Sequence, residues 1–174
     1  MQFMRDPVKR CLSIYRHALR TGFANRAMTR TLWRPIDHRR GFSLDCFLRF
    51  LEKAGVDGDI NVHFRSQVHP VSRFLDVERI DVDACDLFAE LNRLESELNL
   101  RQTDFPNHRA FQQIMKRHVA PASQGRLADE TTLLTHTDAR DAWPAFEDQL
   151  RPETIARIRR IYASDVAFLE RACP

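Results

Sequence analysis

Apolar side chains recur at intervals of three or four residues through most of this chain, a spacing that places them on one face of a helix. The interval predicts helices over residues 7–19, 24–33, 43–55, 83–98, 108–119 and 152–169. Two short stretches predict strands instead: Phe3-Met4, which precedes a turn, and residues 73–80, which alternate. The pattern therefore predicts a mostly helical chain with a few strands.

The first predicted helix begins at a clearly marked turn. Asp6 can cap the helix, and Pro7 suits its first position, where no amide donor is needed. Arg5 ends the preceding strand. Three polar residues share one face of the helix: Arg10, Ser13 and His17. A basic side chain and a hydroxyl near a helix N-terminus are typical of an anion site.

The third predicted helix has recognisable ends. Ser43 is predicted to cap it, and Phe42 and Phe47 are placed to pack together across its start. Gly55 stands where a left-handed residue commonly ends a helix. This helix is expected to belong to the core.

The second half of the chain gives two further predictions. Asp83 is predicted to cap the helix over 83–98, whose core-facing leucines are Leu87, Leu91, Leu94 and Leu98. Residues 120–148 are rich in Pro, Ser, Gly, Thr and Asp, which predicts a surface loop or insertion. His136 and Asp138 within it are expected to be solvated.

Composition and charge restrict the number of domains and the class of ligand, but they do not identify a particular ligand. The 174 residues, 43% of them hydrophobic, suffice for one domain with its own core. A formal net charge of +3 and a sequence pI near 8.9 favour anionic ligands such as nucleotides or sulfated sugars. Arginines are scattered over every predicted helix, and no aromatic residues are interleaved with a basic stripe, which argues against binding of single-stranded nucleic acid.

The cysteines and histidines predict no metal site. Cys11, Cys46, Cys85 and Cys173 lie too far apart to form a pair with metal-ligand spacing. Cys11 and Cys46 fall on apolar faces and are expected to be buried thiols in a reducing compartment. His63 and His69 are isolated from other ligands. The sequence has no apolar run of membrane-spanning length and no signal peptide, so a cytoplasmic location is expected.

The first strand, turn and helix resemble the 3′-phosphate-binding segment of sulfotransferases. The matching order is Arg5-Asp6-Pro7, then Arg10, Ser13 and Tyr15. In that family the arginine and the serine hold the 3′-phosphate of the donor, 3′-phosphoadenosine 5′-phosphosulfate. The resemblance implies this role for Arg5 and Ser13, with Arg10 in support. The structural alternative is a surface arginine and a solvated serine.

Residues 61–67 are similar to a second family segment, N-x-H-W-x-P-Q. Asn61, His63 and Gln67 match, whereas Phe64 replaces the tryptophan and Ser66 the proline. One reading is a histidine with satisfied hydrogen bonds at the edge of a short strand. The other is a polar wall of the donor or acceptor pocket, which makes His63 the candidate for a catalytic, acceptor-side role.

The final predicted helix is similar to the family's C-terminal signature, L-x-P-e-x-x-x-x-I-x-x-x-Y-x-x-D-F. Pro152, Tyr162 and Asp165 match, and Val166 replaces the phenylalanine. We expect Tyr162 and Asp165 to be structural and to attach this helix to the body of the protein.

The resemblance extends from Phe3 to Leu169 and points to the carbohydrate-type sulfotransferases. It implies an α/β, P-loop NTPase-like fold, here predominantly helical with a few parallel strands. It also implies transfer of sulfate from 3′-phosphoadenosine 5′-phosphosulfate to a hydroxyl, on a carbohydrate acceptor and without a metal.

The family's 5′-phosphosulfate loop precedes the 3′-phosphate segment, and no Gly-rich loop with a lysine occurs in these 174 residues. We therefore expect residues 1–174 to be a single, N-terminally truncated domain without the first βαβ unit. A membrane-associated full-length form is compatible with this expectation.

Two alternatives stay open at this point. One is a catalytically inactive remnant that keeps nucleotide affinity, and the other is a helical, Arg-rich protein that binds a partner or nucleic acid. The acceptor, the catalytic base and the oligomeric state are not determined by the sequence.

Overall fold

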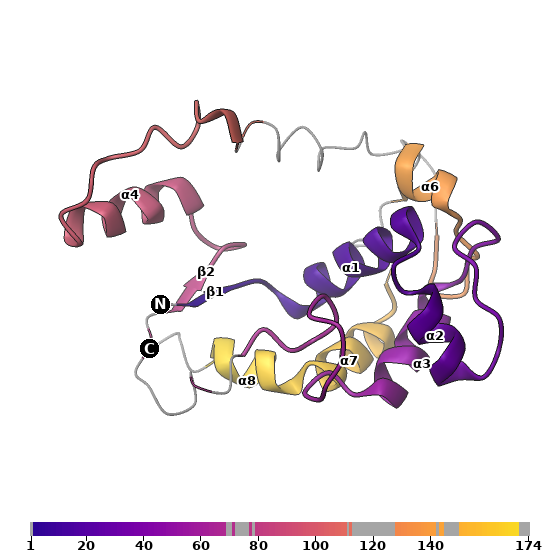
Figure 1. Cartoon of the computed structure of the whole chain (residues 1–174). Helices are drawn as coiled ribbons and strands as arrows, with labels where there is room; N and C mark the ends of the chain where they lie inside the picture. Colours follow the sequence, from indigo (N-terminus) through magenta and orange to yellow (C-terminus); the bar gives the residue numbers. More distant parts are fainter. Residues whose placement is uncertain are drawn as a thin grey trace.

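The computed structural model describes residues 2–68, 71, 77, 79–110, 112, 128–141, 143–144 and 150–170. In chain order, the elements are β1 (Gln2–Met4), α1 (Pro7–Thr21), α2 (Asn25–Leu32), α3 (Leu44–Ala54), β2 (Arg79–Asp81), α4 (Leu87–Glu97), α6 (His136–Asp141), α7 (Pro152–Ile161) and α8 (Ala163–Glu170). Most of the described chain is helical, with two parallel strands, a combination that agrees with an α/β fold (Figure 1).

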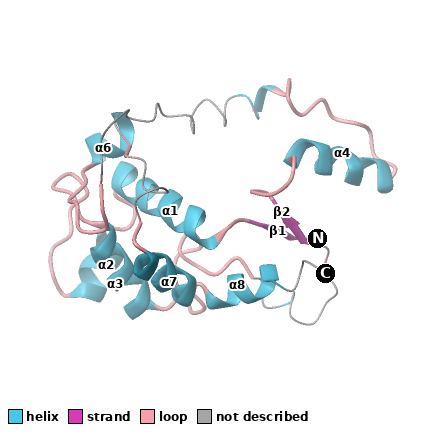
Figure 2. Cartoon of the chain, turned by 180° about the vertical axis from the view of Figure 1, so that it is seen from behind, coloured by secondary structure: helices cyan, strands magenta, loops and turns pink. Residues whose placement is uncertain are grey.

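The two strands form a small parallel sheet. Gln2 lies opposite Arg79, and Met4 lies opposite Asp81. The pairing continues one step further, because the Val82 amide donates to the Met4 carbonyl at 2.9 Å. Parallel strands need a long crossover connection, and here the helices α1, α2 and α3 lie between them in the chain. β1 runs directly into α1, and β2 leads to α4 (Figure 2).

The main core lies among the helices. α1 packs against α6 and α7, and α2 packs against α3. Tyr15 and Phe47 are fully buried at its centre, with ring centroids 5.6 Å apart. The Tyr15 hydroxyl donates to the Phe42 carbonyl at 2.7 Å, so the polar end of this buried ring is satisfied. Burial of these rings and of the aliphatic residues around them supplies the main hydrophobic stabilisation.

The predicted ends of the early helices are confirmed. Asp6 caps α1, and the Ser43 hydroxyl accepts from the Cys46 amide at 3.2 Å at the start of α3. Phe42 and Phe47 stack across that start with centroids 6.5 Å apart. Gly55 follows α3 with a φ of 72°, a conformation that glycine adopts at little cost.

The prediction for the start of α4 was wrong. Asp86, not Asp83, caps this helix and accepts from the Phe88 and Ala89 amides. Of the four leucines predicted to face the core, only Leu94 is buried, and Leu98 is 66% exposed. The helix lies at the far end of the molecule from α2 and α3, where less of the protein surrounds it (Figure 1).

The stretch 120–148 contains more structure than a surface loop. Its described residues include α6 and an antiparallel bridge between Phe42 and Leu134, and Leu134 and Ala139 are fully buried. Residues 120–127, 142 and 145–148 lie outside the described part of the chain.

Two other predicted elements are only partly described. β2 begins at Arg79, and residues 73–76 and 78 of the predicted strand lie outside the described chain. In the predicted helix over 108–119, the described residues 109, 110 and 112 are helical. No helix among the described residues is long and apolar enough to cross a membrane.

Candidate functional site

The turn between β1 and α1 is held by hydrogen bonds on all sides. The Asp6 carboxylate accepts from the Val8 and Lys9 amides at 3.0 and 2.9 Å, which caps α1. The Asp6 amide donates to the Asp83 carboxylate at 2.8 Å. Asp83 was predicted to cap a helix; it instead joins the turn after β2 to the turn after β1. Two backbone donors at the N-terminus of α1 are thus already occupied.

Gln67 holds the same turn from the other side. The Arg5 amide donates to Gln67 Oε1 at 3.0 Å, and Gln67 Nε2 donates to the Arg5 carbonyl at 2.9 Å. One side-chain amide therefore satisfies both backbone polar groups of Arg5.

Arg5 and Ser13, the predicted 3′-phosphate ligands, both reach the surface. The Arg5 side chain is 43% exposed, and its Nε lies 3.4 Å from Asp83 Oδ1. Among the described residues, the two terminal nitrogens of Arg5 have no hydrogen-bond partner. Ser13 is exposed on α1. The strand, turn and helix therefore present a guanidinium and a hydroxyl to solvent.

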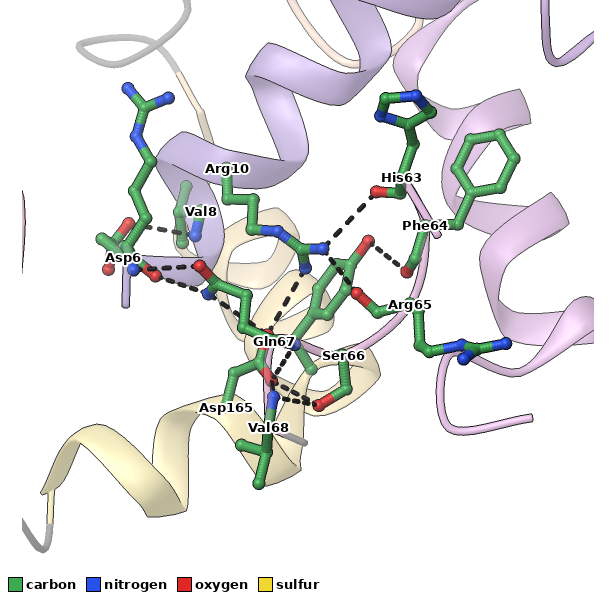
Figure 3. A network of polar contacts seen from close by, with 12 residues as sticks. Asp6, Val8, Arg10, His63, Phe64, Arg65, Ser66, Gln67, Val68 and Asp165 are labelled. Carbon is green, nitrogen blue, oxygen red and sulfur yellow. Dashed lines mark hydrogen bonds and ion pairs between the residues drawn. The ribbon is translucent and has the colours of Figure 1, made fainter. Parts of the chain in front are cut away.

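Arg10 is engaged within the protein. Its guanidinium lies 3.5 Å from Asp165 Oδ2, donates to the carbonyls of His63 and Arg65, and sits over the Tyr162 ring at 5.3 Å (Figure 3). Its side chain is 15% exposed. Arg10 thus connects α1 to the 63–65 turn and to α8. Unlike Ser13 on the same helix, it is largely buried.

Asp165 is the centre of this network (Figure 3). Its fully buried carboxylate accepts from the Ser66 hydroxyl and from the amides of Gln67 and Val68 at 2.8 and 3.3 Å. The Tyr162 hydroxyl donates to the Phe64 carbonyl at 3.2 Å. The predicted structural role of Tyr162 and Asp165 is confirmed, because both attach the C-terminal helices to the 64–68 segment.

The 61–67 segment is a turn, not a strand edge. Asn61 Oδ1 accepts from the His63 amide at 3.0 Å and starts the turn. Phe64 is fully buried and stacks on Phe23 with centroids 5.1 Å apart. Ser66, which stands where the family has proline, uses its hydroxyl to reach Asp165. The two departures from the family pattern are therefore accommodated.

His63 projects to the surface beside α1. Its ring centroid lies 5.4 Å from that of His17 and 5.1 Å from that of Phe23. His17 follows Ser13 by one helical turn, so the three rings extend the surface that carries the candidate phosphate ligands. The helical spacing placed His17 on the Ser13 face, but no local pattern indicated that His63 would meet it.

Three buried ionisable groups near the site, those of Cys11, Tyr15 and Tyr162, are not candidates for acid–base chemistry. Burial raises the pKa of the Cys11 thiol to about 12, although the Arg10 charge opposes this effect. Burial also raises the pKa of Tyr15 and of Tyr162. These groups stay protonated at neutral pH and are shielded from a ligand.

The other histidines and acids lie elsewhere. The His38 and His136 rings lie edge to face, with centroids 5.9 Å apart. The Asp138 carboxylate accepts a hydrogen bond from the Thr135 amide at 2.8 Å, at the start of α6. In the described part of the chain, no group of three or more His, Cys, Asp or Glu side chains is placed to hold a metal ion.

The segment around α1 and α2 is strongly basic. Residues 7–44 contain nine Lys and Arg residues but a single acid, Asp37, although the whole chain has almost as many acids as bases. Such an imbalance favours the approach of anions to this part of the molecule.

A family model described as the sulfotransferase family matches residues 1–170. Neither a curated protein nor a solved structure matches the chain.

Proposed function

Because this chain belongs to the sulfotransferase family, whose model spans residues 1–170, we propose that it transfers a sulfuryl group from 3′-phosphoadenosine 5′-phosphosulfate to a hydroxyl, with a carbohydrate as acceptor. The fold is proposed to be of the P-loop type, with β1 and β2 as neighbouring strands of its parallel sheet. The observation that carries the proposal is the β1–α1 turn, which presents Arg5 and Ser13 to solvent.

The donor's 3′-phosphate is proposed to bind to side chains at this turn. The planar guanidinium of Arg5 can donate two parallel hydrogen bonds to phosphate oxygens, and the Ser13 hydroxyl can add a third. Asp6 already occupies the Val8 and Lys9 amides, so recognition falls to side chains. Arg10 contributes from within, through its contacts to the 63–65 turn.

The acceptor is proposed to lie on the side of His63. In the transfer, the S–O bond to the donor's phosphate breaks, the sulfuryl group moves to the acceptor oxygen, and the proton of that oxygen passes to the His63 imidazole. As in phosphoryl transfer, positioning of the two oxygens in line with sulfur supplies much of the catalysis. The adjacent His17 and Phe23 rings support this placement, because they restrict the His63 ring.

Calorimetric titration with adenosine 3′,5′-bisphosphate, the desulfated donor, tests the donor site. We expect Arg5→Ala to weaken binding about 10- to 100-fold, the usual effect of losing a hydrogen bond to a charged group, and Ser13→Ala to weaken it about 3- to 10-fold. Arg49→Ala and Ser96→Ala remove an exposed arginine and an exposed serine from other helices and should change affinity less than about twofold.

Two results would contradict the proposed donor site, and a third would contradict the proposed transfer. Wild-type protein that is folded but does not bind the bisphosphate would exclude the donor site. Equal affinities in wild type, Arg5→Ala and Ser13→Ala would place the nucleotide elsewhere. Binding without transfer to any carbohydrate hydroxyl would instead favour the inactive, nucleotide-binding alternative.

A further inference from the structure

We propose that Gln67 is a positioning residue for the nucleotide site: its side-chain amide clamps the backbone of Arg5 and thereby sets where the guanidinium is presented. The inference rests on the proposed function, because it assumes that Arg5 contacts the donor. Gln67 itself is only partly exposed and is not proposed to touch the ligand.

The clamp consists of two hydrogen bonds to one residue. Gln67 Oε1 accepts from the Arg5 amide at 3.0 Å, and Gln67 Nε2 donates to the Arg5 carbonyl at 2.9 Å. A neighbouring strand would satisfy these groups in a sheet, but Arg5 lies just beyond the end of β1. The side chain of Gln67 makes the two hydrogen bonds that a neighbouring strand would otherwise make with Arg5.

The clamp is fastened at its base. The Gln67 carbonyl accepts from the side-chain amide of Gln2 on β1, and the Gln67 amide donates to Asp165 Oδ1 at 2.8 Å. Movement of the 66–68 backbone would break both contacts. β1, which leads into Arg5, and α8, which carries Asp165, are therefore joined through Gln67.

Asp165 also fixes which way the side-chain amide faces. Gln67 Nε2 lies 3.4 Å from Asp165 Oδ2, and an ionised carboxylate only accepts hydrogen bonds. The amide nitrogen must therefore face Asp165 and the Arg5 carbonyl, which leaves Oε1 toward the Arg5 amide. An amide flip would put two acceptors against each other.

The consequence for ligand binding is preorganisation. Gln67 holds both polar groups of the Arg5 backbone, and Asp83 holds the next amide, that of Asp6, at 2.8 Å. The backbone of Arg5 is thus fixed before any ligand arrives, so ligand binding does not have to order this backbone. Without the clamp, the guanidinium would sample more positions and bind phosphate more weakly.

A double-mutant cycle tests the proposal. Gln67→Met keeps the length of the side chain and removes both hydrogen bonds, and we expect it to weaken binding of adenosine 3′,5′-bisphosphate about tenfold through lost preorganisation. In the Arg5→Ala background the same change should weaken binding less than about twofold, because residues that act through one another are not additive. A purely structural role would lower affinity equally in both backgrounds and would overturn the proposal.

Tyr162→Phe is the matched control. It removes one hydrogen bond to the same segment, at the Phe64 carbonyl, without touching Arg5. We expect it to lower stability but to leave the affinity for the bisphosphate within about twofold of wild type. A loss of affinity equal to that of Gln67→Met would show that any loosening of the segment suffices, which would overturn the proposal.

A second measurement does not depend on a variant that folds or on a ligand. Amide hydrogen exchange in the wild-type protein should show protection of the Arg5 amide, which the clamp bonds. Exchange at the rate of an unstructured amide would exclude the clamp. Wild type that fails to bind the bisphosphate would overturn the proposed function and this inference with it, whereas normal binding by Gln67→Met would overturn this inference alone.

Discussion

At the scale of single residues, the polar side chains around the β1–α1 turn divide into those that hold the protein together and those that face solvent. Arg10, Gln67 and Asp165 are bonded to backbone groups far away in the chain. Arg5 and His63 instead present their polar ends outward. The first set holds the segments around the site in place, and the second set is the one that we expect to contact ligands.

His63 gives a prediction at this scale. His63→Ala should lower the turnover number of sulfate transfer about 100-fold, because it removes the proposed acceptor of the hydroxyl proton. The affinity for adenosine 3′,5′-bisphosphate should stay unchanged, because His63 is proposed to act on the acceptor side. Steady-state transfer from labelled donor and a parallel titration measure the two quantities.

His108→Ala provides the comparison, since it removes another exposed histidine from a segment outside the site. Turnover by His63→Ala that equals turnover by His108→Ala would remove His63 from the mechanism. Loss of nucleotide affinity in His63→Ala would move it to the donor side.

Residue roles could be predicted from the sequence where the partners are neighbours in the chain. Asp6 and Ser43 could be predicted as caps because the amides that donate hydrogen bonds to them lie only two or three residues away. Asp83 was mistaken for a cap because Asp86 has the same chemistry three residues later, and contacts to the distant Arg5–Asp6 turn decide between them. The clamp by Gln67 spans 62 residues and leaves no local pattern.

At the scale of elements, α1 is the helix on which the site is built, and both of its ends are specified. Asp6 caps its start, and Gly22 ends it in the left-handed conformation with a φ of 70°. The Gly22 amide donates to the Ala18 carbonyl at 2.9 Å. The ring of His38 covers Gly22 and is held there by the side chain of Asn25 at 2.9 Å.

Gly22→Ala should therefore destabilise the protein. The new Cβ would lie 2.5 Å from His38 Nδ1, and the backbone conformation is strained for any residue with a side chain. We expect a loss of about 1–3 kcal/mol in the free energy of unfolding, measured by urea denaturation. In Gly58→Ala no described atom lies within 4 Å of the added Cβ, so this variant should unfold like wild type. An unchanged midpoint for Gly22→Ala would refute the packing of His38 on this helix end.

Elements were predictable where the apolar spacing runs for several turns, as it does in α1, α3 and α7. The short α6 was missed because its surroundings are rich in loop-forming residues. A local signal was present nonetheless. Thr135 and Asp138 stand three residues apart and bond each other's amides, as in a capping box. That spacing is the feature that could have located the helix.

At the scale of the whole molecule, Arg157 connects the C-terminal helices to the core. Its guanidinium on α7 makes two hydrogen bonds to Glu52 at 2.7 Å and one to Asp45 at 2.8 Å, both on α3. The hydrogen bonds from Arg157 lower the pKa of Glu52. Three hydrogen bonds from one guanidinium to two carboxylates distinguish this cluster from an ordinary surface pair.

The contribution of this cluster should depend on pH. The pKa of Glu52 is lower in the folded state than in the unfolded state, so the stabilisation is present above about pH 4.5 and is lost as the pH falls through the folded value. Arg157→Met should lower the free energy of unfolding by about 1 kcal/mol at pH 7, a modest value because Glu52 is 40% exposed and solvent screens the pair. Urea denaturation should show this difference shrinking toward pH 3.

Arg159→Met, on the exposed part of the same helix, is the control and should have little effect at either pH. A difference between Arg157→Met and wild type that stays the same from pH 7 to pH 3 would mean that packing of the arginine stem, and not its charge, supports α7.

The long range of the Asp165 contacts bears on how the protein is made. Arg10 and Asp165 are separated by 155 positions, and Gln67 and Asp165 by 98. Contacts between such distant positions form slowly, because closing a long loop costs entropy before any contact offsets it. During synthesis, the β1–α1 turn therefore emerges before α8 but acquires its final shape only after α8 has been translated. A nascent chain halted before that point would contain Arg5 and Ser13 but would lack the Asp165 contacts that hold this part of the protein in place.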